Sequence, residues 1–173
     1  MRAYTETIES PAGPLTFVVN DEGALLWLKF TEGEYERTVE QELERQGLEI
    51  APDRKPTARA GAQLREYYAG TRRTFDLSLA LTGSEWQKVV WRALTSIPYG
   101  ETRTYGEIAA MVGCPRSARA VGKANATNPL PLVVPCHRVI GANGSLTGFA
   151  GGLHLKTRLL EHEAGIIARS ANP

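Results

Sequence analysis

The chain has 173 residues, of which 42% are hydrophobic, enough to form a substantial core in one large domain or two small ones. No apolar run approaches membrane-spanning length and the first residues lack the apolar stretch of a signal peptide, so we expect a cytoplasmic protein that does not associate with membranes. The two cysteines, Cys114 and Cys136, exclude a disulfide framework. They and the three histidines do not fall into a zinc-ligand spacing, so we predict no structural metal.

The formal net charge of +1 conceals a segregation of charge along the chain. Residues 1–80 carry ten Lys and Arg against fourteen Asp and Glu, a net charge of −4, whereas residues 81–173 carry ten against five, a net charge of +5. A basic half is typical of a surface that binds a polyanion, most often a nucleic acid. A solvated basic face without a partner is the alternative.

The N-terminal half predicts β-strands followed by helices. Alternating and branched apolar residues indicate strands at 4–8, 15–19 and 25–30, separated by turns rich in Pro, Gly and Asp. A surface helix is expected over 34–46, closed by Gly47, and a second helix is expected to follow Pro56 and end before Gly70. Phe75, Leu77, Leu79 and Leu81 alternate as in a further strand. Catalytic residue types are not concentrated here, so we interpret residues 1–83 as a scaffold domain.

From residue 84 onward, the pattern becomes mainly helical. Ser84 and Gln87 match a capping box, in which the serine accepts from a free backbone N–H at the helix start and the glutamine reaches back. The helix that follows is expected to bury one apolar face, consisting of Trp86, Val89, Val90, Ala93, Leu94 and Ile97. Such a face is more often core than a binding site.

Two short helices come next and are joined by a turn that contains glycine. Thr104 and Glu107 form a second capping box, and the helix after it is expected to direct Ile108, Met111 and Val112 inward. A further helix is expected to start near Arg116 and to direct Ala118, Val121 and Ala124 inward. This arrangement is typical of a helix-turn-helix unit, whose second helix, here with Arg116, Arg119 and Lys123, meets DNA. Many helical hairpins with this pattern do not bind DNA.

The run Pro135-Cys136-His137-Arg138 holds the candidate nucleophile. A thiol attacks as its thiolate, and a free cysteine near pKa 8.5 needs a nearby base or positive charge, which His137 and Arg138 offer. Leu132-Val133-Val134 predicts a buried strand leading into this run, and Pro135 restricts the geometry there, so Cys136 is expected to leave a strand in a set direction. A buried structural cysteine with a chance neighbour is the alternative.

The last part of the chain combines a glycine-rich loop with a helix. Residues 148–152 form a loop that can approach a ligand closely, because glycine has no side chain. A final helix is expected over 153–164, with Leu155, Leu159 and Leu160 inward and Glu163 near its end, leaving only 170–173 frayed.

Taken together, the pieces of residues 84–165 carry a resemblance to a known family. The ordered motifs are Trp86-Gln87 to Trp91, Ile97-Pro98-Tyr99-Gly100, Thr104-Tyr105, Arg119-Ala120-Val121-Gly122, Ala124-Asn125, Asn128-Pro129, Pro135-Cys136-His137-Arg138-Val139-Ile140, Gly151-Gly152 and Leu159-Leu160-Glu161-His162-Glu163. In this order they resemble the O6-alkylguanine-DNA alkyltransferases, with the Pro-Cys-His-Arg-Val element the most specific. The resemblance implies an α+β fold. Residues 1–83 would form a ribonuclease H-like domain with a β-meander and helices, and residues 84–173 a mainly helical, winged-helix-like domain with a helix-turn-helix.

The resemblance also implies the activity. The protein would move the alkyl group from O6-alkylguanine, and less well from O4-alkylthymine, in double-stranded DNA to Cys136, once per molecule and without S-adenosylmethionine. It would act as a monomer, with cooperative binding on DNA left open. His137 would hold the Cys136 proton through a bridging water, Glu163 would orient that histidine, Tyr105 would donate its hydroxyl to guanine N3, and Asn128 would brace the turn before the active site.

Further roles on the DNA side follow from the same resemblance. A base in a duplex must be flipped out to reach such a pocket, and Arg119 would fill the vacated space from a helix in the minor groove. The rest of the DNA-binding set would be Arg116, Lys123, Ala120 and Gly122. The base pocket would be formed by Tyr105, Pro135, Val139, Phe149, Ala150 and Gly151, with Phe149 standing where many family members have tyrosine.

Three other functions compete with this interpretation. An alkyltransferase-like sensor binds alkylated DNA without transfer, but such proteins lack the acceptor cysteine that is present here. A cysteine hydrolase needs an oxyanion hole and usually an Asn or Asp on its histidine. A transcription regulator would use the helix-turn-helix in the major groove and would leave the activated cysteine unexplained.

Overall fold

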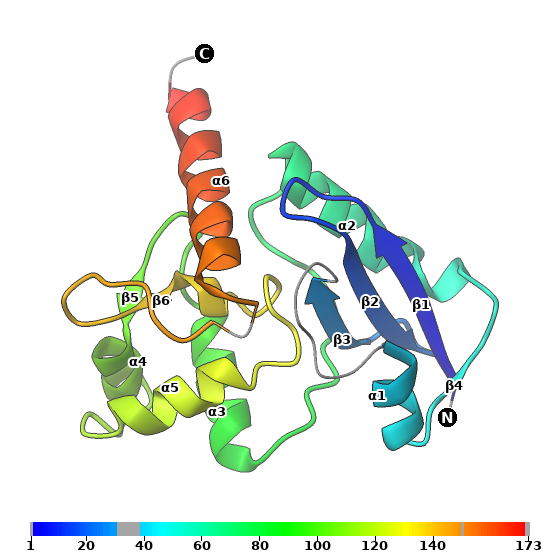
Figure 1. Cartoon of the computed structure of the whole chain (residues 1–173), viewed down its shortest axis with the longest axis horizontal. Coiled ribbons are helices and arrows are strands. Elements are labelled where there is room, and N and C mark those ends of the chain that lie inside the picture. The colour runs from blue at the N-terminus through cyan, green and yellow to red at the C-terminus, as the bar shows by residue number, and fades with distance from the viewer. Residues whose placement is uncertain (1, 31–38, 150, 172–173) are drawn as a thin grey trace. The chain divides into compact units, whose positions relative to one another are not determined.

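The computed structural model describes residues 2–30, 39–149 and 151–171. The chain separates into two compact units, residues 1–81 and 82–173 (Figure 1). The elements of the first unit are β1 (Arg2–Ile8), β2 (Leu15–Asn20), β3 (Leu25–Phe30), α1 (Val39–Arg45), β4 (Glu49–Ile50), the 3₁₀ turn η1 (Lys55–Thr57) and α2 (Ala58–Ala69). Those of the second are α3 (Glu85–Leu94), β5 (Arg103–Thr104), α4 (Tyr105–Met111), α5 (Ala118–Ala126), the 3₁₀ turn η2 (Cys136–Arg138), β6 (Val139–Ile140) and α6 (Leu153–Ala171).

The first unit is a four-stranded mixed sheet with a helix on each face. The strand order is β3-β2-β1-β4; the meander is antiparallel and β4 runs parallel to β1. Leu43 of α1 joins a buried cluster with Ala3, Val18 and Trp27, which places α1 on one face. Arg65 of α2 pairs with Glu6, whose side chain points to the face opposite Ala3 because strand side chains alternate. The three strands predicted from the sequence are confirmed.

Helix α2 begins after Pro56 and ends at Gly70 in the left-handed region, as predicted. Gly47, with φ of 66°, likewise follows α1. Residues 34–38 of the helix predicted over 34–46 lie outside the described residues. The strand predicted over residues 75–81 is wrong, because Leu79 forms only an isolated bridge with Leu25 and the alternating apolar side chains are half-buried. Among the described residues, this segment is bonded to β3 only at Leu25, which donates to Ser78 O at 2.8 Å and accepts from Ala80 N at 2.9 Å.

The second unit consists mainly of the helices α3, α4, α5 and α6, together with a short parallel pair formed by β5 and β6 (Figure 1). Both capping boxes are present: Ser84 with Gln87 opens α3, and Thr104 with Glu107 opens α4. Helix α5 contacts both α3 and α4, completing the predicted helical hairpin. No helix in the described part of the chain is both long and apolar enough to cross a bilayer.

Several local predictions in this unit are wrong. Helix α5 starts at Ala118, so Arg116 lies in the preceding turn and not on the helix. Val89 of α3 and Met111 of α4 were expected to be inward but are 40% and 52% exposed. On α3 the buried Trp91 fills the interface in place of Val89. Leu160 is only half-buried.

Two backbone predictions around the site are also wrong. Residues 132–134 form a turn, in which Leu132 has φ of 76°, and Cys136 opens the 3₁₀ turn η2 rather than leaving a strand. Helix α6 does not stop at residue 164 but continues to Ala171, so residues 170–171 are helical, while 172–173 lie outside the described residues. Ile166, which is 7% exposed, gives the longer helix a further buried contact.

Candidate active site

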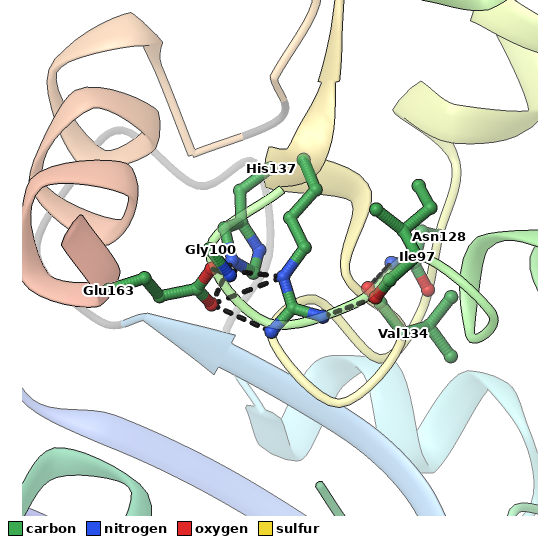
Figure 2. A network of polar contacts seen from close by, with 7 residues as sticks. Ile97, Gly100, Asn128, Val134, His137 and Glu163 are labelled. Carbon is green, nitrogen blue, oxygen red and sulfur yellow. Dashed lines mark hydrogen bonds and ion pairs between the residues drawn. The ribbon is translucent and has the colours of Figure 1, made fainter. Parts of the chain in front are cut away.

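The candidate nucleophile, Cys136, is buried in a tight loop held by hydrogen bonds. Its backbone N–H donates to Val134 O at 2.7 Å, while its carbonyl accepts from the Asn125 amide at 3.3 Å. Asn128 donates to Val134 O at 2.8 Å (Figure 2). It also accepts from Leu130 N at 3.0 Å. Asn125 of α5 and Asn128, which follows the helix, therefore hold the backbone on both sides of Pro135. Cys114, in contrast, is exposed.

Glu163 is the centre of a buried polar network. Its Oε1 accepts from His137 Nε2 at 2.8 Å, and its Oε2 accepts from the Gly100 backbone N–H at 3.0 Å (Figure 2). The Arg138 guanidinium donates through Nη2 to Oε1 at 2.8 Å and through Nε to Oε2 at 3.0 Å, while its Nη1 donates to Ile97 O at 2.7 Å. His137 and Glu163 are fully buried. The network ties α6, η2 and the segment after α3 together.

The charges of this network determine how His137 is protonated. Burial alone would raise the pKa of the Glu163 carboxyl, but hydrogen bonds and charge from His137 and Arg138 hold it well below its usual range. Burial also lowers the pKa of His137, with Glu163 opposing and Arg138 adding to the effect. A carboxylate accepts but cannot donate, so a neutral His137 carries its hydrogen on Nε2. Its Nδ1 is left as a buried acceptor with no hydrogen-bond partner among the described residues.

The Cys136 thiol is protonated at rest. Burial raises its pKa to about 11, although the Asn128 side chain, the Lys156 ammonium and the backbone amides of Cys136 and His137 act in the opposite direction. Arg138 was expected to supply the positive charge for this thiol, but it pairs with Glu163; Lys156 is the cation that favours the thiolate. The thiol therefore needs a base to remove its proton as it attacks.

A second group of contacts lies beside the thiol. Lys156, in the first turn of α6, is fully buried and donates to the backbone carbonyls of Val139 and, at 2.9 Å, Thr147. The hydroxyl of Tyr105, at the start of α4, donates to the same Thr147 carbonyl at 2.8 Å. Gly122 of α5 faces the Tyr105 ring, since an added Cβ would lie 3.8 Å from its ring carbons. This group links α4, α5 and α6 around Cys136.

The structure brings most of the predicted pocket residues to this place. Pro135 and Val139 are buried beside Cys136, and Phe149 and Gly151 are half-buried in the loop that follows Thr147. A Cβ at Gly151 would lie 3.0 Å from Cε1 of Phe149, so the absent side chain allows the ring its position. Ala150 lies outside the described residues.

The predicted DNA-facing residues are on the outer side of the helical hairpin. Arg119 and Lys123 are exposed on α5, Arg116 is exposed in the turn before it, and Ala120 is half-buried on α5. Two indole N–H groups of α3 hold α5 in place: Trp86 donates to Ala120 O at 3.3 Å and Trp91 donates to Ala124 O at 2.8 Å. Helix α5 thus carries exposed basic residues on one side and holds the nucleophile loop through Asn125 on the other.

Comparison with known proteins places the chain in a family. The family model "6-O-methylguanine DNA methyltransferase, DNA binding domain" matches residues 85–165. A methylated-DNA–protein-cysteine methyltransferase of Methanosarcina acetivorans is 46% identical over 160 residues, which cover 92% of this chain and 97% of the relative. The protein of that name from Mycobacterium tuberculosis H37Rv is 49% identical over 162 residues, covering 92% of each. This chain belongs to the methylated-DNA–protein-cysteine methyltransferases.

Solved structures agree with this membership of the methylated-DNA–protein-cysteine methyltransferases. A crystal structure of the Mycobacterium tuberculosis O6-methylguanine methyltransferase matches with a TM-score of 0.81 at 45% identity, covering 94% of this chain and 93% of that one. A structure of the Mycobacterium tuberculosis protein in complex with DNA also matches with a TM-score of 0.81, covering 94% of each chain. The family resemblance and the α+β class predicted from the sequence are confirmed.

Two side chains around the site of this methyltransferase family member, Lys156 and Asn125, and one ion pair, Arg138 with Glu163, were missed by sequence reasoning. Lys156 could have been noticed, since it lies between the inward residues Leu155 and Leu159 of an amphipathic helix, where a lysine is unexpected. The contact of Asn125 with Cys136 and the pairing of Arg138 with Glu163 join distant segments, so no pattern of neighbouring residues indicates them. In the described part of the chain, no group of three or more His, Cys, Asp or Glu side chains is placed to hold a metal ion.

Proposed function

We propose that this chain repairs alkylated DNA by moving the alkyl group from O6 of guanine to the thiol of Cys136. The observation that carries the proposal is the buried Cys136 thiol next to the His137–Glu163 pair, in a chain that belongs to the methylated-DNA–protein-cysteine methyltransferases. The S–C bond forms as the O6–C bond breaks. A thioether is not hydrolysed, so each molecule acts once and needs no cofactor.

His137 is the proposed base. Its Nε2 donates to Glu163, which leaves Nδ1 as an acceptor. We assign Nδ1 the role of taking the Cys136 proton through a bridging water. The Glu163 carboxylate then stabilises the imidazolium. Guanine leaves with its negative charge offset by the Tyr105 hydroxyl and takes up a proton, so the overall exchange is thiol and alkylguanine for thioether and guanine.

DNA is the proposed partner, since a relative of 45% identity is described in complex with it. The exposed residues Arg116 and Lys123 would contact phosphates, and Arg119 would fill the space that the flipped base leaves in the duplex. The flipped base would enter between Tyr105 and the loop after Thr147. Ala120 and Gly122 leave the helix face small enough for close approach. We assign DNA binding and alkyl transfer to residues 84–173 and a scaffold role to residues 1–83. The protein would act in the cytoplasm as a monomer.

Mass spectrometry tests the proposal. Incubation with a duplex that carries one O6-methylguanine should add one methyl group per molecule, located on Cys136 and saturating at that ratio. The matched control is Cys136→Ala, which should retain the damaged duplex without gaining mass. An unmodified wild-type protein that still retains the damaged duplex would contradict transfer and favour the sensor function instead.

A further inference from the structure

The carbonyl of Thr147 accepts hydrogen bonds from two different elements. The Tyr105 hydroxyl of α4 donates to it at 2.8 Å, and the Lys156 ammonium of α6 donates to it at 2.9 Å. A carbonyl oxygen has two lone pairs, so the two donors can be accommodated together. In the free protein, Tyr105 is therefore bonded to the protein itself and not available to a ligand.

Lys156 holds two walls of the candidate base pocket at once. Besides Thr147 O, its ammonium donates to the carbonyl of Val139, the residue that follows η2. The side chain is fully buried. Burying an ammonium is costly unless it is hydrogen-bonded, and here the bonds go to the backbone of the loop and of the strand after the nucleophile. Lys156 thus fixes the spacing between these two segments.

The Tyr105 side chain lies beside Lys156 and the loop that follows Thr147. The Tyr105 ring lies beside Lys156, whose Nζ is 6.0 Å from the ring centroid. The next residue in the loop, Gly148, has φ of 61°, and a Cβ there would lie 3.2 Å from the Tyr105 hydroxyl. The hydroxyl is thus packed against backbone that carries no side chain.

We propose that Lys156 is a positioning residue that keeps the Thr147 carbonyl hydrogen-bonded while the Tyr105 hydroxyl moves from that carbonyl to the substrate base. This inference rests on the proposed function, in which Tyr105 donates to the departing guanine. Thr147 is exposed in the free protein. A base bound beside the loop would exclude water from the Thr147 carbonyl, which then stays hydrogen-bonded only if Lys156 remains as its donor. Lys156 lowers the cost of the transfer of the Tyr105 bond and keeps the loop in place during the reaction.

A double-mutant cycle on single-turnover transfer from an O6-methylguanine duplex tests the coupling. Tyr105→Phe should slow transfer about tenfold or more in the wild-type background. In the Lys156→Met background, Tyr105 must stay on Thr147, so the same substitution should slow transfer less than about twofold. Equal factors in the two backgrounds would overturn the proposal, because a Lys156 that only supports the fold gives additive effects.

Two controls keep the cycle interpretable. Tyr99→Phe removes a hydroxyl from another partly buried tyrosine of the same unit, and its effect should be the same in the wild-type and Lys156→Met backgrounds, so coupling there would overturn the proposal as well. If wild-type protein transfers no methyl group to Cys136, the proposed function itself fails; transfer with an additive cycle removes only the role of Lys156.

A measurement that needs no lysine variant covers the case in which Lys156→Met does not fold. In Tyr105→Phe, amide hydrogen exchange of residues 145–149 should stay within about threefold of wild type, because Lys156 still holds Thr147. Exchange that accelerates to the level of an open loop would show that Tyr105, and not Lys156, holds the segment, which contradicts the proposal.

Discussion

At the scale of single residues, Glu163 controls the protonation of His137 and balances the charge of Arg138. It accepts from His137, Arg138 and Gly100, which come from two other segments of the chain. An ionised Glu163 determines which nitrogen of His137 carries a proton, and it balances the buried charge of Arg138. A buried carboxylate with these partners is therefore required both for folding and for the proposed base.

Glu163→Gln should destabilise the protein by about 3–5 kcal/mol, because it leaves the Arg138 charge buried without a counter-ion. Chemical denaturation at neutral pH measures this loss. Transfer at saturating duplex should also slow, since the imidazolium of His137 loses its anion. An exposed ion pair gives the matched control: Glu101→Gln removes the partner of Arg103 and should cost less than about 1 kcal/mol.

The same carboxyl predicts how stability depends on pH. The pKa of Glu163 is lower in the folded protein than its ordinary value of 4.5, so the unfolded chain binds the proton more readily. The stabilisation is complete above that ordinary value and is lost as the pH falls through the folded-state pKa. The unfolding free energy of wild type should fall steeply in acid, whereas that of Glu163→Gln should fall less. Parallel curves would contradict the assignment.

At the scale of elements, α5 connects the exposed basic face to the nucleophile loop. Arg119 and Lys123 point outward from it, while Asn125 holds the Cys136 carbonyl from its inner side. The indoles of Trp86 and Trp91 fix the helix from α3. A duplex bound on the outer face of α5 would thus be positioned relative to the thiol by one rigid helix.

Arg119→Ala should slow transfer from duplex DNA about tenfold, yet change the reaction with free O6-benzylguanine less than about twofold, because only a duplex has a gap to fill after flipping. Arg92→Ala, which removes an exposed positive charge from the last turn of α3, is the charge-matched control and should affect the duplex reaction less. Equal losses on the two substrates would remove the proposed role of Arg119.

Helix α6 depends on a glycine in another segment. Gly100 has φ of 77°, and a Cβ there would lie 2.0 Å from Cδ1 of Ile167. Gly100→Ala should lower the unfolding free energy by about 1–2 kcal/mol from the left-handed backbone alone, with a further loss from the clash. Adding Ile167→Ala should reduce the cost of Gly100→Ala relative to its cost in wild type. A cost that is unchanged between the two backgrounds would argue against the contact.

At the scale of the whole molecule, charge is divided between the two halves of the sequence. The net charge of +5 over residues 81–173 coincides with the unit that holds α5 and Cys136. Basic groups that contact phosphates release counterions, so binding weakens with salt. The net charge of −4 over residues 1–80 would not attract DNA.

Raising the salt concentration from about 50 to about 200 mM should therefore weaken duplex binding by at least about tenfold and leave the reaction with free O6-benzylguanine unchanged. Fluorescence anisotropy with a labelled duplex gives the slope of affinity against salt. Removing Arg116 or Lys123, the proposed phosphate contacts, should each reduce that slope by about one. A duplex affinity that does not depend on salt would contradict this electrostatic surface.

Local signals in the sequence were enough for many features of the fold. The capping boxes at Ser84 and Thr104, the glycine at position 70 and the first three strands, with the turns between them, depend on residues close together in the chain, and all were predicted. The same holds for Cys136 as the candidate nucleophile, since its neighbours His137 and Arg138 are adjacent in the chain.

The tertiary structure decided which side chains meet. His137 and Glu163 lie 26 residues apart, Tyr105 and Thr147 lie 42 apart, and no periodicity within one element specifies such pairs. The strands expected near residues 75–81 and 132–134 failed for the same reason: apolar runs report burial but not backbone geometry. The buried lysine at 156 depends on two carbonyls, Val139 and Thr147, from outside its own helix. A local sequence pattern indicates which secondary structure a segment favours. A charged side chain can be buried only where other segments of the fold supply its hydrogen-bond partners, and these are distant in the sequence.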